Sequence, residues 1–186
     1  MLRMPACSCV LLLSLMSAAA ASGCWWMDNR FNTYHEESLK LLDQMAANTT
    51  EDAENPVAFP KHVYERAAEA SVADRLALVV QILQEVGDLF DQKNTSSSAW
   101  DERTLDSFLN IIHEEKSGLQ SCLDRTHGKT QNGKGKNRKL CSYFTRLSRS
   151  VLKGKQHSAE AWEMIRKEVQ MHLFQASRLI PTKTSK

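Results

Sequence analysis

Residues 158–180 read SAEAWEMIRKEVQMHLFQASRLI, and their hydrophobic pattern decides the class of fold. Ser158 can accept a hydrogen bond at the N-terminus of a helix, and Pro181 predicts where that helix ends. A helix places residues three or four apart on one face, so a regular apolar stripe indicates packing against a core. Here the stripe consists of Trp162, Ile165, Val169, Leu173 and Ala176. The stretch therefore predicts an amphipathic helix anchored by a tryptophan.

The same helical spacing recurs along the chain. Apolar helix faces lie within 31–45, 63–67, 76–90, 105–122 and 140–151. The chain of 186 residues has only 7 Gly and 4 Pro, and alternating, strand-like runs are few. We therefore expect an all-α fold with a short second helix, in which Trp100 and Trp162 are core and packing residues.

The first two predicted helices are separated by a long connection, 48–60. Adjacent antiparallel helices commonly need fewer residues between them. A long connection suits an overhand crossing between helices that run in the same direction, as in up-up-down-down bundles. Loop length permits this direction without deciding it.

The N-terminal sequence predicts a secreted protein. Arg3 precedes an apolar run at Val10–Met16, and small residues follow at 21–23, as a signal peptide requires. The run is shorter than the roughly 20 residues that span a bilayer, and a retained signal anchor is the alternative. We expect a signal peptide at 1–23 and one helical domain at 24–186, extracellular and not inserted into a membrane.

Charge is divided unevenly along the chain. Residues 24–124 carry 8 Lys/Arg and 19 Asp/Glu, a balance of −11, whereas 125–186 carry 15 and 3, a balance of +12. We expect the two parts to pack as complementary surfaces. Nucleic-acid binding is disfavoured because the basic part lacks an interleaved set of surface aromatics. The basic segment 127–139 predicts a solvated loop, with a weak heparan-sulfate contact as the sharper alternative.

Three cysteines remain after the expected cleavage, Cys24, Cys122 and Cys141. Secretion permits disulfides, and three cysteines allow three choices of one pair, with one thiol left over. For Cys141 the alternatives are a partly buried free thiol and a disulfide-linked dimer. Two sequons, at Asn48 and Asn94, predict N-glycosylation in surface loops.

The sequence argues against an enzyme. Its six histidines lack zinc-ligand spacing, and neither a nucleophile elbow nor a phosphate-binding glycine loop is present. His35, beside Glu36 and Glu37, is expected on a solvated helix face. We therefore predict no catalytic residue, no metal site and no cofactor.

Several short motifs occur in a distinctive order. Cys24 stands at the predicted mature start, Phe59-Pro60 precedes the second helix, and Trp100-Asp101-Glu102 lies 22 residues before Cys122. Ala161-Trp162-Glu163 opens the last helix. In this order and over nearly all of the mature chain, the sequence resembles the type I interferons. The resemblance implies a helical cytokine bundle with an up-up-down-down core and an additional short helix.

The same resemblance implies a disulfide between Cys24 and Cys122. Many interferons have a second bridge, one of whose cysteines would stand where this chain has Glu160. Both cysteines of that bridge are absent here, so the chain looks like the two-cysteine group of teleost fish interferons. Cys141 departs from that count.

The resemblance also implies a function. A type I interferon bridges two different receptor chains of the class II cytokine-receptor type and triggers antiviral signalling and gene induction. Arg166 matches a receptor-facing arginine, although a local salt bridge is an equal alternative, and Lys167 and Gln170 are candidate contacts further out. Position 171 is Met, where mammalian members often carry a basic residue. The alternatives are another secreted helical cytokine, such as an interleukin-10-like protein, and a helical carrier of an apolar ligand.

Overall fold

The computed structural model describes residues 24–46, 55–91, 100–127 and 135–181. In these ranges the chain forms helices and no strand, which confirms the predicted all-α class. The elements are α2 (Trp25–Asn29), α3 (Phe31–Gln44), α4 (Lys61–Ala68), α5 (Val72–Phe90), α6 (Glu102–His127), α7 (Arg138–Arg146), the π-helix η4 (Leu147–Lys153) and α8 (Ala159–Leu179).

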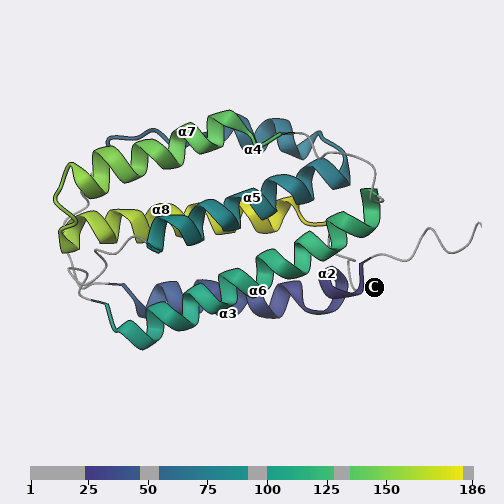
Figure 1. Ribbon diagram of the computed structural model, residues 1–186, viewed down its shortest axis with the longest axis horizontal. Coiled ribbons are helices and arrows are strands. Elements are labelled where there is room, and N and C mark those ends of the chain that lie inside the picture. Colours follow the sequence, from purple (N-terminus) through teal and green to yellow (C-terminus); the bar gives the residue numbers. More distant parts are fainter. Residues whose placement is uncertain (1–23, 47–54, 92–99, 128–134, 182–186) are drawn as a thin grey trace, which may run out of the picture.

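The four long helices form an up-up-down-down bundle. Figure 1 shows α3 and α5 running in one direction, and α6 and α8 running in the opposite direction. The long connection that follows α3 contains α4, so the overhand crossing joins α3 to α5 and α4 is the additional short helix. The α7 and η4 segment lies outside this core and packs against α5 and α8.

The helix ends follow from the local sequence. The hydroxyl of Ser158 accepts a hydrogen bond from the Ala161 amide at 3.2 Å, and Ser71 caps α5 in the same way. Helix α8 ends at Leu179, two residues before Pro181, which cannot continue a helix. The stretch expected as one helix over 140–151 instead changes from α7 to the π-helix η4.

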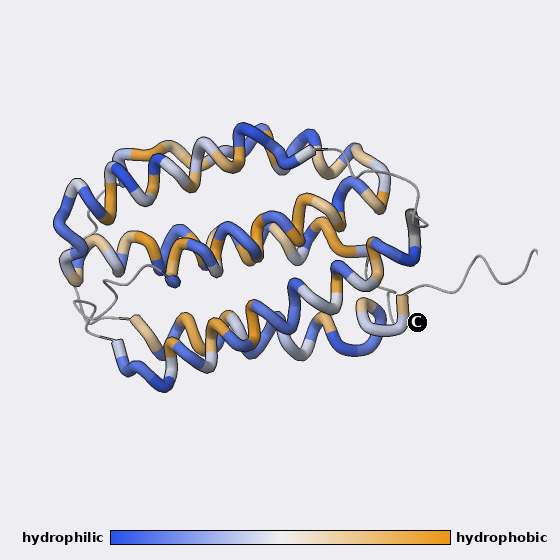
Figure 2. Tube along the Cα trace, in the orientation of Figure 1, coloured by the Kyte–Doolittle hydropathy of each residue, from blue (hydrophilic) through white to orange (hydrophobic). Residues whose placement is uncertain are grey.

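The core is formed where the apolar faces meet, visible as orange segments in Figure 2. Trp162 of α8 is fully buried, and its ring centroid lies 5.9 Å from that of Phe90 on α5. Trp100, just before α6, is half-buried and packs its ring 5.4 Å from Trp162. Both tryptophans therefore act as packing residues at one end of the bundle.

One residue of α3 departs from its predicted environment. His35 was expected on a solvated face, but it is only 6 % exposed and lies between α3 and α6. Its Nδ1 is 3.3 Å from Oε2 of the fully buried Glu115, and its ring stacks on Phe31. The reason is helical periodicity, since position 35 follows Phe31 by four residues and shares its inward face, whereas Glu36 points outward.

Candidate functional site

Helix α8 presents one face to the core and another to solvent. The outward residues follow one another at helical spacing, and we call them the outer α8 face: Lys167, Met171, Phe174 and Arg178. Two large apolar side chains are exposed here, Met171 at 46 % and Phe174 at 57 %. Adjacent exposed hydrophobic side chains with a charged rim are typical of protein interaction surfaces.

Arg166 lies on the buried side of α8. Its Nε and Nη2 donate to the two carboxylate oxygens of Glu163 at 2.9 and 2.7 Å, and its Nη1 donates to the carbonyl of Leu42 at 3.3 Å. Both charged residues are almost inaccessible, at 6 % and 5 % exposure. The structure thus contains the salt bridge that the sequence left as an alternative, and Arg166 offers little surface to a partner.

The two neighbouring candidates are placed differently. Lys167 is exposed. Gln170 is half-buried and donates from Nε2 to Oδ1 of Asp43 at 2.7 Å, which ties α8 to the last turn of α3. The exposed end of α3 therefore borders the outer α8 face.

Behind this face, His172 is enclosed by aromatic rings. The centroids of Phe59, Tyr143 and Phe144 lie 4.7, 5.1 and 4.8 Å from that of the imidazole. A hydrogen bond joins the Tyr64 hydroxyl to Nδ1 of His172. Burial lowers the pKa of His172 to about 3, so the ring is neutral at physiological pH.

A second polar group in this region holds the long connection against α8. Glu168 accepts hydrogen bonds from the hydroxyl of Tyr143 and, at 2.9 Å, from Nδ2 of Asn55. The Oδ1 of Asn55 in turn accepts from the Val57 amide at 3.0 Å. Burial, reinforced by Glu168, raises the pKa of Tyr143, so its hydroxyl keeps the proton that it donates. Residues 55–60 are thereby fixed beside α8.

The segment that precedes α3 is attached to α6 by a disulfide. Cys24 and Cys122 form a disulfide across a sequence separation of 98. Next to it, Trp26 packs directly on the backbone of Gly118, where a Cβ atom would lie 2.1 Å from the indole. Glycine is therefore required at this close approach of Trp26 to α6.

Comparison with known proteins decides the family. A family model described as the interferon alpha/beta domain matches residues 27–183. The chain belongs to this interferon family. It is 32% identical to interferon a3 of Oncorhynchus mykiss over 173 residues, which cover 93% of this chain and 94% of the relative. It is 28% identical to interferon alpha-B of Bos taurus over 93% of both chains.

Solved structures agree with this assignment. Zebrafish interferon 1 superposes with a TM-score of 0.72 at 33% identity, covering 84% of this chain and 97% of that one. Zebrafish interferon 2, at 22% identity and a TM-score of 0.60 over 80% of this chain and 97% of that one, supports the fold alone. The type I interferon resemblance is confirmed, and the protein is an interferon-like cytokine rather than an interleukin-10-like one. Interferons are not enzymes, in agreement with the sequence.

The free cysteine of this interferon lies on α7 and faces α5. Cys141 of α7 is half-buried, its Sγ donates to Oε1 of Glu85 at 3.2 Å, and it accepts from Nε2 of Gln81 at 3.1 Å. Burial, followed by the nearby Glu85 carboxylate, raises the pKa of the thiol. A raised pKa keeps more of the thiol protonated, and the two alternatives for Cys141, a free thiol and a disulfide-linked dimer, stay predictions.

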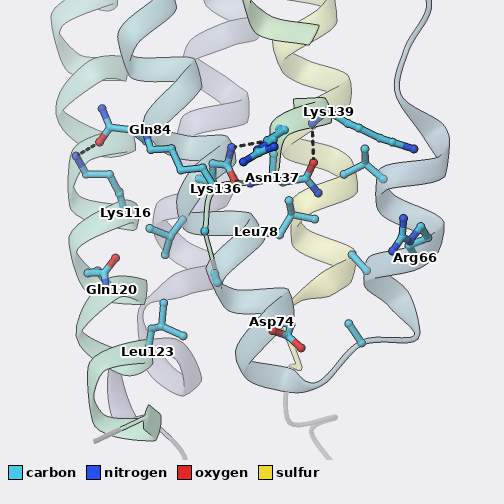
Figure 3. Close-up of a pocket in the computed structure, with 18 of the residues that line it drawn as sticks. Arg66, Asp74, Leu78, Gln84, Lys116, Gln120, Leu123, Lys136, Asn137 and Lys139 are labelled. Atoms are coloured by element: carbon cyan, nitrogen blue, oxygen red, sulfur yellow. Dashed lines mark hydrogen bonds between the residues drawn. The ribbon is translucent and has the colours of Figure 1, made fainter. Parts of the chain in front are cut away.

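A surface groove of about 1160 Å³ lies on the side of the interferon formed by α4, α5, α6 and residues 135–139. Figure 3 shows Lys116 and Gln120 of α6 on one side of it, Arg66 of α4 on the other, and Lys136 between them. Side chains of both charge types line it, including Asp74.

Several predictions lie outside the described residues. These are the signal peptide 1–23, the sequons at Asn48 and Asn94, and most of the basic segment 127–139, and all stay predictions. No helix within the described ranges is long and apolar enough to cross a membrane. Within those same ranges, no group of three or more His, Cys, Asp or Glu residues could hold a metal ion.

Sequence reasoning missed one part of the outer α8 face. It named Arg166, which is buried, and did not name Phe174, which is the more exposed of the two apolar residues. The signal was present in the intervals from 167 to 171, 174 and 178, since four, three and four residues follow the outward side of a helix.

Proposed function

We propose that this chain is a secreted type I interferon that bridges two different class II cytokine-receptor chains and triggers antiviral signalling and gene induction. Membership of the family supports the activity. The observation that carries the proposal for this molecule is the outer α8 face, where Met171 and Phe174 are exposed on an otherwise well-packed helix. A cytokine has no chemistry to perform, so its function depends on such surfaces.

One receptor chain would bind the outer α8 face together with the connection after α3. The apolar pair provides the surface that is desolvated on binding, and Lys167 and Arg178 provide a charged rim. We therefore expect an apolar patch with acidic neighbours on this receptor. The hydrogen bond from Asn55 to Glu168 supports this arrangement because it holds residues 55–60 next to α8.

The second receptor chain would bind the opposite side of the bundle, formed by α4, α5 and α6. Two contacts on opposite sides allow one ligand to hold two receptors at once. Each contact can be weak, because the second binding event becomes effectively intramolecular at the membrane surface. Signalling then follows from kinases bound to the two receptor tails.

The first experiment treats fish cells with purified protein that starts at Cys24 and carries the Cys24–Cys122 disulfide. We expect phosphorylation of receptor-linked transcription factors within minutes, followed by antiviral gene induction and resistance to virus. Phosphorylation without the antiviral programme would replace this proposal with another cytokine class. If well-folded protein gives no response in several cell types from matched species, the interferon activity is refuted and a bound apolar ligand should be sought by extraction and mass spectrometry.

The site is tested by removing its apolar pair. The double variant Met171→Ser/Phe174→Ser should weaken binding to one receptor chain by about 30-fold, since anchor residues contribute on the order of 2 kcal/mol. The matched control, Trp25→Ser/Val72→Ser, removes two exposed apolar residues elsewhere, at 60 % and 41 % exposure. Equal losses in both variants, or none in the first, would show that the outer α8 face is not the receptor contact.

A further inference from the structure

The outward face of α7 and η4 is rich in positive charge. Residues 125–159 contain ten Lys/Arg and no Asp/Glu. In the described part of this segment, four exposed cations lie on one side of the helix. Together with the exposed Ser142, which stands between the first and the second cation, they are spaced three or four residues apart. We call them the α7 basic stripe: Lys139, Arg146, Arg149 and Lys153.

Within the part of the chain that the structure describes, the four cations of the stripe form no ion pair. Among the described residues, no carboxylate lies within 4.0 Å of any of the four cations. Other cations behave differently, since Lys155 pairs with Glu160 at 2.6 Å and Lys116 of α6 donates to Gln84 at 2.9 Å. The stripe is therefore a line of uncompensated charge, and bringing such charges together is unfavourable without an anionic partner.

The stripe is long and continues into the groove. From Lys139 to Lys153 it extends a little less than the roughly 21 Å that an α-helix of this length spans, because the π-helix η4 rises less per residue than α7. At its beginning, Lys136 and Arg138 line the groove of Figure 3, as does Arg66 of α4. A ligand that matches this surface is extended and carries negative charges at repeated intervals.

We propose that the α7 basic stripe binds a linear sulfated glycosaminoglycan chain. Sulfate groups repeat along such a chain and would pair with successive cations of the stripe. Ser142 and Ser150 are exposed between the cations and can donate hydrogen bonds to sulfate or sugar oxygens. The site differs from a contact through the 127–139 loop alone, because most of its charge lies on α7 and η4.

Other polyanions fit this surface less well. Single-stranded nucleic acids are bound on exposed aromatic rings, but the two aromatic residues of α7, Tyr143 and Phe144, are buried. Helices that lie on membranes insert exposed Trp, Phe or Leu residues, and the exposed positions of this face are cations and small polar residues. Both alternatives are included in the test below.

The test measures binding of the purified protein to immobilised heparan sulfate over a range of NaCl concentrations. The stripe variant Lys139→Gln/Arg146→Gln/Arg149→Gln/Lys153→Gln should bind more than about tenfold more weakly near 0.15 M salt. The slope of log binding constant against log NaCl concentration should be less steep by about 3, since each lost ionic contact removes just under one released counterion. If the quadruple variant does not fold, the two double variants should each lose about half of that slope.

The matched control removes four exposed cations from other surfaces: Arg30, Lys40, Lys61 and Arg103, each changed to Gln. It should keep most of the binding. An equal loss in the control would refute the site and leave an effect of net charge only. Unchanged binding by the stripe variant would also refute the site, as would equal stripe-dependent binding to duplex DNA or to vesicles of phosphatidylcholine and phosphatidylserine.

Chondroitin sulfate and desulfated heparan sulfate then separate a preference for one sulfated chain from a general need for sulfate. The assay contains no receptor, so its outcome is independent of the signalling proposal.

Discussion

The buried pair of Arg166 and Glu163 provides the most informative perturbation. Changing Arg166 to Ala removes two charge-assisted hydrogen bonds from a carboxylate that is 5 % exposed, and one from the Leu42 carbonyl. Removing one partner of a buried ion pair costs about 3–5 kcal/mol because the remaining charge stays desolvated. Whole domains are stable by only about 5–15 kcal/mol, so Arg166→Ala should lose a large part of the free energy of unfolding.

The measurement is urea unfolding followed by circular dichroism. With a slope near 2 kcal/mol per M, the midpoint should fall by about 2 M in Arg166→Ala. The control is Glu163→Met/Arg166→Met, which replaces both charges by apolar side chains of similar length. Such replacements are often neutral or stabilising, so this variant should unfold within about 1 kcal/mol of the parent protein.

The same double variant separates a structural role from a receptor contact. If Arg166 acts through the pair, the folded Glu163→Met/Arg166→Met protein should bind its receptor within about threefold of the parent, whereas a lost hot-spot contact weakens binding at least tenfold. A well-folded double variant with such a loss would restore the receptor-facing role. A stability loss below about 1 kcal/mol in Arg166→Ala would refute the buried-pair reasoning itself.

Three further outcomes concern stability. Replacing both Cys24 and Cys122 by Ser should lower the free energy of unfolding by about 4–5 kcal/mol, since the bridge closes a loop with a separation of 98 residues; an unchanged urea midpoint would contradict this. Gly118→Ala should lower the melting temperature, because the added methyl group clashes with Trp26 at a cost of about 1–3 kcal/mol. Its control, Gly87→Ala, has open space around the new Cβ atom and should raise the melting temperature. Equal shifts in the two variants would refute the close approach of Trp26 to Gly118. The pKa of His172 is lowered to about 3 in the folded protein, so on acidification the unfolded chain binds the proton first. The stability that is present above about pH 6.5 is therefore lost toward pH 3, at up to about 1.4 kcal/mol per pH unit. The variant His172→Gln should flatten this acid limb of the stability–pH curve, and an unchanged limb would contradict the assignment.

Features that depend on residues close in sequence were predicted well. Helix α8 was expected over 158–180 and is observed at Ala159–Leu179, because its hydrophobic stripe, N-terminal cap and terminal proline act within a few residues of one another. The exposed side of the same helix could have been read from the same spacing. The exact form of the fifth helix could not, because a local sequence pattern does not distinguish α7 followed by the π-helix η4 from one continuous α-helix.

The sequence by itself determined the helical class, the family, the cysteines available for pairing and the unequal distribution of charge. Tertiary structure alone decided the partners of the polar residues. His35 meets Glu115 across 80 residues, Asn55 meets Glu168 across 113, and Arg166 reaches the Leu42 carbonyl across 124. Periodicity indicates which face of a helix is inward, but not which neighbour lies opposite it. That choice is made only when all the helices pack together, because most buried polar groups then find a hydrogen-bond partner among the residues that face them.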